Sequence, residues 1–314
     1  MARCFYRLSE TSDPEERLED AALAKALHDV MGEDLQILSP QEPWPDHGLH
    51  LGRTRMFEGP PRNLMAPAMI RYWEDPAFRA HTAREWSLLD LPAAETKVKE
   101  LHASGRDAFV KSTLGTKHYR ERVPQGIELS EALDAMVYSF IDRDPCLLVQ
   151  EAVEMTCERR FLIIDREVLT HSTVANSLTP LSRFQTGGGA LEFDDLHAKT
   201  PGVNTLQYNP TLTQRMLSLA QEIADQSEFE SLCLDMCLID SGPLAGRLEI
   251  IEYNPMQPGM VGLFGCNPYA LAEGVKSWLD DRPYVFPPKD DLDLSSTDNE
   301  TIAEGSGDWM TLDV

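Results

Sequence analysis

Two apolar segments, each interrupted once by a short polar turn, constrain the fold of this chain more than any other feature. Residues 159–175 read RRFLIIDREVLTHSTVA, with the interruption at Asp165–Arg166, and residues 231–254 run from SLCLDMCLID to RLEIIEYN across SGPLAG. Strand-like runs joined by such turns predict β-hairpins. A hairpin pairs its two strands antiparallel, so we expect antiparallel sheet pairs and not a doubly wound parallel sheet.

Helical and strand patterns alternate along the rest of the chain. Residues 14–31 predict a helix, because Asp13 can cap it, Pro14 suits the first position and Gly32 ends it. Further helices are predicted at 93–103, 129–142, 209–226 and 268–280, and further strands at 2–7, 34–40, 107–113 and 145–155. We interpret residues 40–65 as loop and residues 66–90 as broken helix. The order predicts an α+β fold.

The charge balance excludes some classes of partner. The 314 residues carry 52 acids against 28 bases, for a net charge of -24, and residues 290–314 contain eight acids and no Lys or Arg. Nonspecific binding to nucleic acid or to an anionic membrane is therefore not expected. No apolar run approaches the roughly 20 residues of a membrane span. The start, MARCFYRLSE, lacks the apolar core of a signal peptide, so we expect a cytoplasmic location.

Cysteine spacing indicates neither a metal site nor a disulfide framework. The six cysteines are scattered, without a C-x-x-C pair or the usual zinc spacings, at Cys4, Cys146, Cys157, Cys233, Cys237 and Cys266. We interpret them as small buried side chains of a reducing compartment.

Glu252 is the most informative single residue. It has the same parity as Leu248 and Ile250, so a regular strand would bury it among apolar side chains, at a cost unless it binds a cation. Asn254 lies two residues on and leaves the same face, and Asp235 lies on the partner strand. Two carboxylates and an amide oxygen suit Mg²⁺. The alternative is an ion pair between Glu252 and an arginine at a strand end.

A lysine and a linker have the features of a nucleotide site. Lys111 ends the apolar strand of AFVKST and precedes small residues, so it could hold a phosphate, or it could be a surface lysine whose stem packs on the protein. Lys117 follows in GTKHYR. The strand LLVQEAV continues into Gln150–Glu151 and Val153, where main-chain groups could recognise an adenine edge. The alternative for this segment is an ordinary polar strand end.

Two adjacent arginines open the strand of CERRFLIID. Arg159 and Arg160 must point to opposite faces, so one can face a cleft and meet a phosphate or a developing oxyanion. The alternative is a surface charge pair with Glu158.

These motifs, taken in order, resemble the nucleotide site of the ATP-grasp superfamily over roughly residues 95–275. The resemblance implies that Lys111 holds ATP phosphates, that Gln150, Glu151 and Val153 form the adenine linker, that Glu158 and Arg160 form the acid-x-Arg pair of the next strand, and that Asp235, Glu252 and Asn254 bind magnesium. Lys117 and its GTKH context resemble the clade named for one arginine and two lysines. Family members carry a proline after the strand lysine and a glycine-rich flap nearby, whereas this chain has Ser112 and a single glycine, and its triple glycine at 187–189 resembles a substrate loop.

The resemblance also implies a domain division and a reaction. We expect an ATP-grasp fold, in which two α+β subdomains grip ATP between mainly antiparallel sheets, at 93–288. An N-terminal α/β region at 1–92 precedes it, and an acidic disordered tail at 289–314 follows. The implied activity is an ADP-forming ligase that uses ATP and Mg²⁺ to activate a small-molecule or peptide carboxylate as an acyl-phosphate and join it to an amine, with Arg160 and Lys117 as catalytic residues. The alternative is an ATP-binding assembly chaperone for a basic protein partner, without ligase chemistry.

Overall fold

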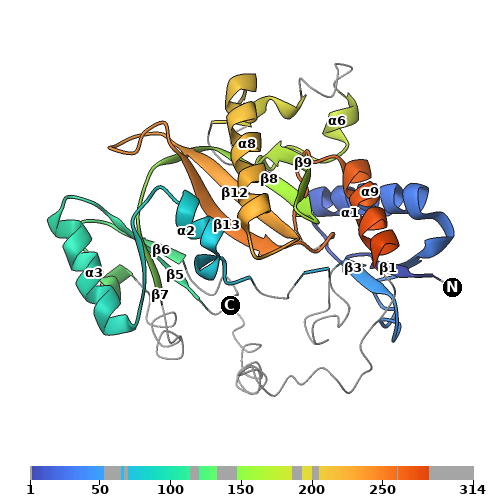
Figure 1. The fold of residues 1–314 in the computed structure, drawn as a ribbon, viewed down its shortest axis with the longest axis horizontal. Helices are drawn as coiled ribbons and strands as arrows, with labels where there is room; N and C mark the ends of the chain where they lie inside the picture. Colours follow the sequence, from blue (N-terminus) through green and yellow to red (C-terminus); the bar gives the residue numbers. More distant parts are fainter. Residues whose placement is uncertain are drawn as a thin grey trace. The chain divides into compact units, whose positions relative to one another are not determined.

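The computed structural model describes residues 2–52, 65–66, 70–113, 120–132, 147–185, 193–199, 205–259 and 261–282 (Figure 1). The chain divides into a compact unit, Met1–Asp281, and a second unit from Arg282 to the end. The fold and the site described below belong to the first unit. The expected acidic tail at 289–314 lies outside the described residues.

A small parallel sheet begins the chain. Its strand order is β2-β1-β3, with β1 at Cys4–Arg7, β2 at Leu35–Leu38 and β3 at Leu49–Gly52. Helix α1, Pro14–Met31, connects the first two strands and is followed by a 3-10 turn, η1, at Gly32–Asp34. As predicted, the Asp13 side chain accepts hydrogen bonds from the first free N–H groups of α1, and Gly32 ends it with a positive φ of 54°. The prediction of loop throughout 40–65 is wrong at β3, because this four-residue strand is too short to show a period.

The large sheet is antiparallel and has the order β13-β12-β8-β9. Both predicted hairpins form in it: β8, Met155–Ile164, pairs with β9, Glu167–Thr173, and β12, Leu232–Ile239, pairs with β13, Leu248–Pro255. Strands β12 and β8 join the two hairpins. The first turn has positive φ at both Asp165 and Arg166, 52° and 65°, which is the turn that matches the twist of paired strands.

The second antiparallel sheet has the order β4-β7-β5-β6 and carries helix α3, Leu91–Ala103, on one face (Figure 1). Its strands are β4 at Trp86–Leu89, β5 at Ala108–Ser112, β6 at Arg120–Val123 and β7 at Leu147–Glu151. The interpretation of 66–90 as helical is therefore wrong at its end. A four-residue strand such as β4 is defined by its pairing with β7, 58 to 64 positions away, and not by a local signal.

The remaining elements are short helices and strands, and longer helices that cover the sheets. They are η2 at Tyr72–Glu74, α2 at Pro76–His81, α4 at Leu129–Ala132, α6 at Ser182–Gln185, β10 at Leu196–Ala198, β11 at Leu206–Tyr208, α8 at Pro210–Gln226 and α9 at Pro268–Asp281. The predicted helices at 209–226 and 268–280 are confirmed. Of the helix predicted at 129–142, residues 133–142 lie outside the described residues.

Three cores hold these layers together. One face of the large sheet packs with α1, α9 and the parallel sheet, which Figure 1 shows on the right. The opposite face packs with α8 and α2, and this core also includes Leu148 of the small sheet. A third core lies between the small sheet and α3. The side of the small sheet that α3 leaves uncovered therefore faces the large sheet.

The cysteines that the structure describes are buried, as expected from the sequence. Within the described residues five cysteines are buried and free, and burial raises the pKa of Cys4, Cys233 and Cys237. None of the helices described is both long and apolar enough to cross a bilayer.

Candidate functional site

A β-bulge in β13 decides which face of the large sheet carries the acidic residues. Asp235 lies opposite Glu252, whereas the next residue of β12, Met236, lies opposite Ile250, so Ile251 is the extra residue. The bulge moves Glu252 to the face opposite that of Ile250 and Leu248. The prediction that Glu252 shares a face with these two residues is wrong, because it assumes an unbroken alternation.

The bulge brings the three predicted metal ligands together. The amide nitrogen Nδ2 of Asn254 lies 3.3 Å from Oδ2 of Asp235 and 3.3 Å from Oε1 of Glu252, and donates to both carboxylates. Asp235 is almost fully buried, and the Glu252 side chain is 12% exposed. Two carboxylates that share an amide donor form one polar centre at the start of β12 and the end of β13.

Arg160 closes this centre on the large sheet. It lies directly opposite Asp235, on the neighbouring strand β8. Its Nε and Nη2 atoms donate to the two carboxylate oxygens of Asp235 at 2.8 and 2.7 Å, and its Nη1 donates to the carbonyl of Gly262 at 2.9 Å. A guanidinium held at three points is fixed in position. Its neighbour Arg159 points to the opposite face, as predicted.

Lys111 reaches the centre from the other sheet. Its Nζ lies 3.1 Å from Oε2 of Glu252 and 3.4 Å from the carbonyl oxygen of Ile251. The rings of Tyr72 and Phe109 lie 5.9 and 5.8 Å from the same nitrogen. Lys111 is therefore 9% exposed and paired, so the alternative of a surface lysine is wrong. Burial, then the charge of Glu252, raises the pKa of Tyr72.

Gln150 lies on the same uncovered side of the small sheet. It is fully buried, and within the described residues neither its Oε1 nor its Nε2 has a hydrogen-bond partner. Its cross-strand neighbours are Trp86 on β4 and Phe109 on β5. An unpaired amide in an apolar site is costly, so this side chain favours a polar ligand over an ordinary strand end.

The other linker residues have separate environments. The Glu151 side chain accepts from Arg106 at 3.3 Å, and its N–H donates to the carbonyl of Glu85 at 2.9 Å. Val153 is half-buried in the connection between β7 and β8, and Glu158 is half-buried two residues before Arg160. Lys117, with the whole GTKH motif, lies outside the described residues, as does the triple glycine at 187–189.

The centre has oxygen donors but few carboxylates. No group of three or more His, Cys, Asp or Glu that could hold a metal exists among the residues described. The donor set therefore comprises two carboxylates and one amide, which suits a hard cation with ligands supplied in part by a bound phosphate. Chemically, such a centre can hold a polyphosphate between Lys111, Arg160 and a metal ion.

Sequence reasoning missed the apolar walls of this centre. Tyr72, Trp86 and Phe109 come from regions read as broken helix or as ordinary strand. Alternation in AFVKST could have placed Phe109 on the face of Lys111. No local signal points to Tyr72 or Trp86, because their positions depend on pairing and packing over long distances.

Opposite Arg160, Arg159 belongs to a second buried cluster. Its Nη1 meets Nδ1 of His171 at 2.6 Å, its Nη2 donates to the carbonyl of Leu196, and its burial lowers its pKa to about 10. Burial, then the nearby Arg159, lowers the pKa of His171 to about 3 and that of His197 to about 4. Both imidazoles are therefore neutral, and His171 accepts from the arginine. The cluster explains Arg159, the first arginine of the motif, as a buried structural cation.

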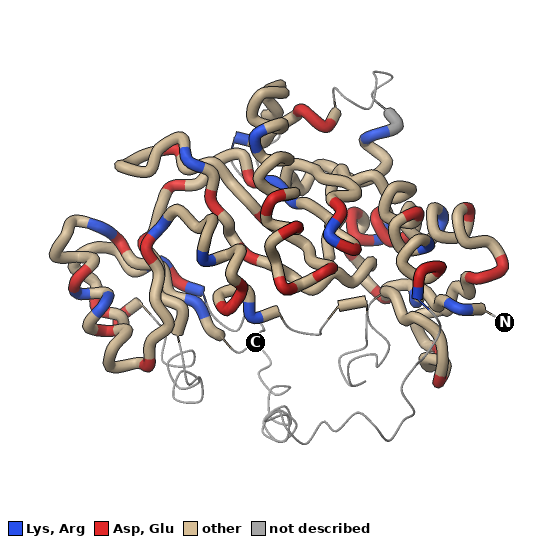
Figure 2. Tube along the Cα trace, viewed as in Figure 1, with Lys and Arg blue, Asp and Glu red and all other residues tan. Residues whose placement is uncertain are grey.

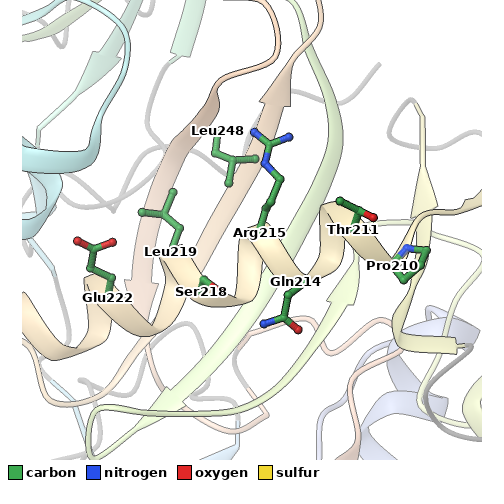
Figure 3. Close-up of a pocket in the computed structure, with 8 residues that line it drawn as sticks. All are labelled: Pro210, Thr211, Gln214, Arg215, Ser218, Leu219, Glu222 and Leu248. Atoms are coloured by element: carbon green, nitrogen blue, oxygen red, sulfur yellow. The ribbon is translucent and has the colours of Figure 1, made fainter.

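A hollow in the described surface lies elsewhere. It is an open depression along α8 that extends to Leu248, lined by Pro210, Thr211, Gln214, Arg215, Ser218, Leu219, Glu222 and Leu248 (Figure 3). Acidic and basic residues are interspersed along the described elements, in the region of α3 as well as in that of α1 and α9 (Figure 2). Neither feature has the converging side chains of the Asp235–Glu252 centre.

Comparison with known proteins gives matches at the level of structure. No family model matches the sequence, and no curated protein does. The ATP-grasp ligase PsnB in complex with a minimal precursor matches with a TM-score of 0.50 and 9% identity, over 88% of this chain and 99% of that one. PsnB with a phosphomimetic precursor variant, Mg and ADP has a TM-score of 0.50 and 10% identity, over 89% and 98%. The D-alanine–D-alanine ligase from Bacillus anthracis complexed with ATP matches at 0.49 and 13%, over 90% and 100%. With its two four-stranded antiparallel sheets and the parallel sheet before them, this chain has the ATP-grasp fold.

Proposed function

We propose that this protein is an ATP-dependent ligase that activates a carboxylate as an acyl-phosphate and joins it to an amine, with release of ADP. The observation that supports this most strongly is the continuous network from Lys111 on the small sheet, through Glu252, Asn254 and Asp235, to Arg160 on the large sheet. The ATP-grasp fold supports it as well, since the matched structures are described as ATP-grasp ligases.

The nucleotide would lie between the two sheets. Lys111 would hold its phosphates, and the unpaired amide of Gln150 would hydrogen-bond the base between the rings of Trp86 and Phe109. Glu151 and Val153 would contribute through their main chain, because the Glu151 side chain is paired with Arg106. PsnB with Mg and ADP and the D-alanine–D-alanine ligase with ATP bind such ligands.

Asp235, Glu252 and Asn254 would hold Mg²⁺, with the amide of Asn254 turned so that its oxygen faces the ion. The three side chains already lie within hydrogen-bond distance of one another. When bound, Mg²⁺ would neutralise part of the negative charge of the phosphates. Glu158, near the start of β8, would contribute to the part of that strand that lies beside the nucleotide.

The reaction would need no side-chain nucleophile. A carboxylate oxygen of the substrate attacks the γ-phosphorus, the bond from that phosphorus to the bridging oxygen breaks, and ADP leaves. The amine nitrogen then attacks the acyl carbon, inorganic phosphate leaves, and the nitrogen loses a proton. Arg160 and Lys117 would stabilise the charge of the transferring phosphoryl group and the tetrahedral adduct. Small-molecule or peptide carboxylates and amines are the substrate classes.

A thermal-shift titration with ATP, with and without Mg²⁺, tests the proposal. A ligand at 100 times its dissociation constant adds about 2.7 kcal/mol, which corresponds to a shift of several degrees. We expect the full shift only when both are present, and ADP release when a matching carboxylate and amine are added. The absence of any shift with MgATP contradicts the proposal.

A further inference from the structure

Every carboxylate oxygen of the proposed metal site already accepts a hydrogen bond from the protein. Both oxygens of Asp235 accept from Arg160, at 2.8 and 2.7 Å. Oε2 of Glu252 accepts from Lys111 at 3.1 Å, and Oε1 accepts from Asn254 at 3.3 Å. A metal ion must therefore share these oxygens with donors of the protein or displace them.

The charges of the same side chains cancel. Two carboxylates face two cations, and the side chains are between 2% and 12% exposed, so water screens them weakly. A divalent cation is attracted to net negative charge, and Mg²⁺ in particular gives up its water reluctantly. Because the charges of these four described side chains sum to zero, they attract the ion weakly.

The two cations differ in how firmly they are held. Arg160 is bidentate to Asp235 and also bound to Gly262, and its strand is paired with the strand of Asp235 in one sheet. Lys111 comes from the other sheet, and its described contacts are single hydrogen bonds to Glu252 and to the carbonyl of Ile251 and the nearby rings of Tyr72 and Phe109. A flexible lysine that meets the site from a separate sheet is the partner that can be exchanged.

We propose that Lys111 is an internal counter-ion that closes the metal site until nucleotide binds. This inference rests on the proposed function. The polyphosphate of ATP draws Lys111 away from Glu252, which leaves a net negative centre, and the divalent cation then binds to Glu252, Asp235 and the phosphates together. Metal binding is thereby conditional on nucleotide, and the empty protein takes up no free divalent cation.

The test is a nucleotide-free titration with Mn²⁺, followed by electron paramagnetic resonance of the free ion. We expect the wild-type protein to bind Mn²⁺ weakly, and Lys111→Met to bind it about tenfold or more tightly, because the variant loses a positive charge next to Glu252. The matched control is Lys97→Met, which removes a lysine of α3 that pairs with Glu85 and should leave Mn²⁺ affinity unchanged. If Lys111→Met does not fold, Lys111→Gln replaces it.

The outcomes separate this inference from the proposed function. Equal Mn²⁺ affinity of wild type and Lys111→Met overturns the counter-ion role, even if MgATP binds normally. Tight binding of Mn²⁺ alone to the wild-type protein also overturns it. Failure of ATP to bind with any metal contradicts the proposed function instead, and it does so in the thermal-shift titration, which is independent of the Mn²⁺ arm.

Discussion

Strand β13 carries two glutamates that lie three residues apart. Each forms an ion pair with a cation from a segment that precedes the large sheet in the sequence. Glu249 is fully buried and accepts from Arg84 Nε at 3.0 Å, from the hydroxyl of Thr82 at 2.8 Å and from the N–H groups of Ala83 and Arg84. Arg84 also donates to the carbonyl of Ile250 at 3.2 Å. Glu252 is 12% exposed and shares its oxygens between a lysine and an amide.

The difference separates a structural ion pair from an exchangeable one. Glu249 has several donors, all within one segment, 82–84, so none can leave without exposing a buried charge. The cation that pairs with Glu252 in the described part of the chain, Lys111, belongs to another sheet. The ion pair between a glutamate and an arginine that the sequence left open for Glu252 thus exists on the same strand, at Glu249.

The largest effect is expected at the structural pair. Glu249→Gln leaves Arg84 buried without an anion, which should cost about 3–5 kcal/mol of unfolding free energy. Urea denaturation followed by circular dichroism measures this. Glu252→Gln, the matched control on the same strand, should cost about 1–2 kcal/mol. Equal losses for the two variants would remove the distinction between the pairs.

Ligand binding should be affected at the exchangeable pair, where the expected loss of stability is the smaller one. Glu252→Gln and Lys111→Met should weaken MgATP by about 10–100-fold, since each loses a charge-assisted contact. Calorimetric titration with MgATP and with adenosine measures the loss and locates it, because adenosine lacks the phosphates and should bind as before. If both ligands are weakened equally, Lys111 does not hold the phosphates.

Gln150 sharpens the contrast, because here binding and stability should change in opposite directions. Gln150→Leu removes an amide that is buried and unpaired in the described structure, so unfolding free energy should rise by about 1–3 kcal/mol. ATP affinity should fall by about five- to tenfold, the value of one hydrogen bond. Thermal melts and the ATP titration on one sample measure both. A less stable Gln150→Leu would show that the amide is satisfied in the free protein.

Acid sensitivity tests the cluster on the opposite face. His171 and His197 have pKa values of about 3 and 4 in the folded protein, far below their ordinary value near 6.5. Between these values the unfolded chain binds more protons, so stability is fully present above pH 6.5 and falls toward pH 4. Each histidine contributes up to about 1.4 kcal/mol per pH unit.

His171→Asn provides the control for this pH dependence. Asparagine keeps an acceptor for Arg159 but cannot be protonated, so the loss of stability on acidification should become less steep. Urea midpoints at pH 7, 6 and 5 measure the slope. An unchanged slope would assign the acid sensitivity to other groups.

Local signals determined much of this fold from the sequence. The capping residues of α1, the turn at Asp165–Arg166 and the two hairpins act over a few residues, so composition and spacing alone predict them. The order of the site motifs also lies in the sequence, and the structure places Lys111 and Gln150 on one side of the small sheet, with Lys111 in contact with Glu252. Their roles in binding remain predictions.

Only the tertiary structure decided which side chains meet. The register between β12 and β13 shifts by one residue, so Ile251 has no partner in β12. This bulge places Glu252 on the same face as Asp235. The pairing of β4 with β7 and the ion pair of Arg84 with Glu249 likewise join residues 58 or more positions apart. A period of two in the sequence specifies a face only while the strand remains regular. Register, bulges and ion partners are set by contacts between distant segments, which no local pattern encodes.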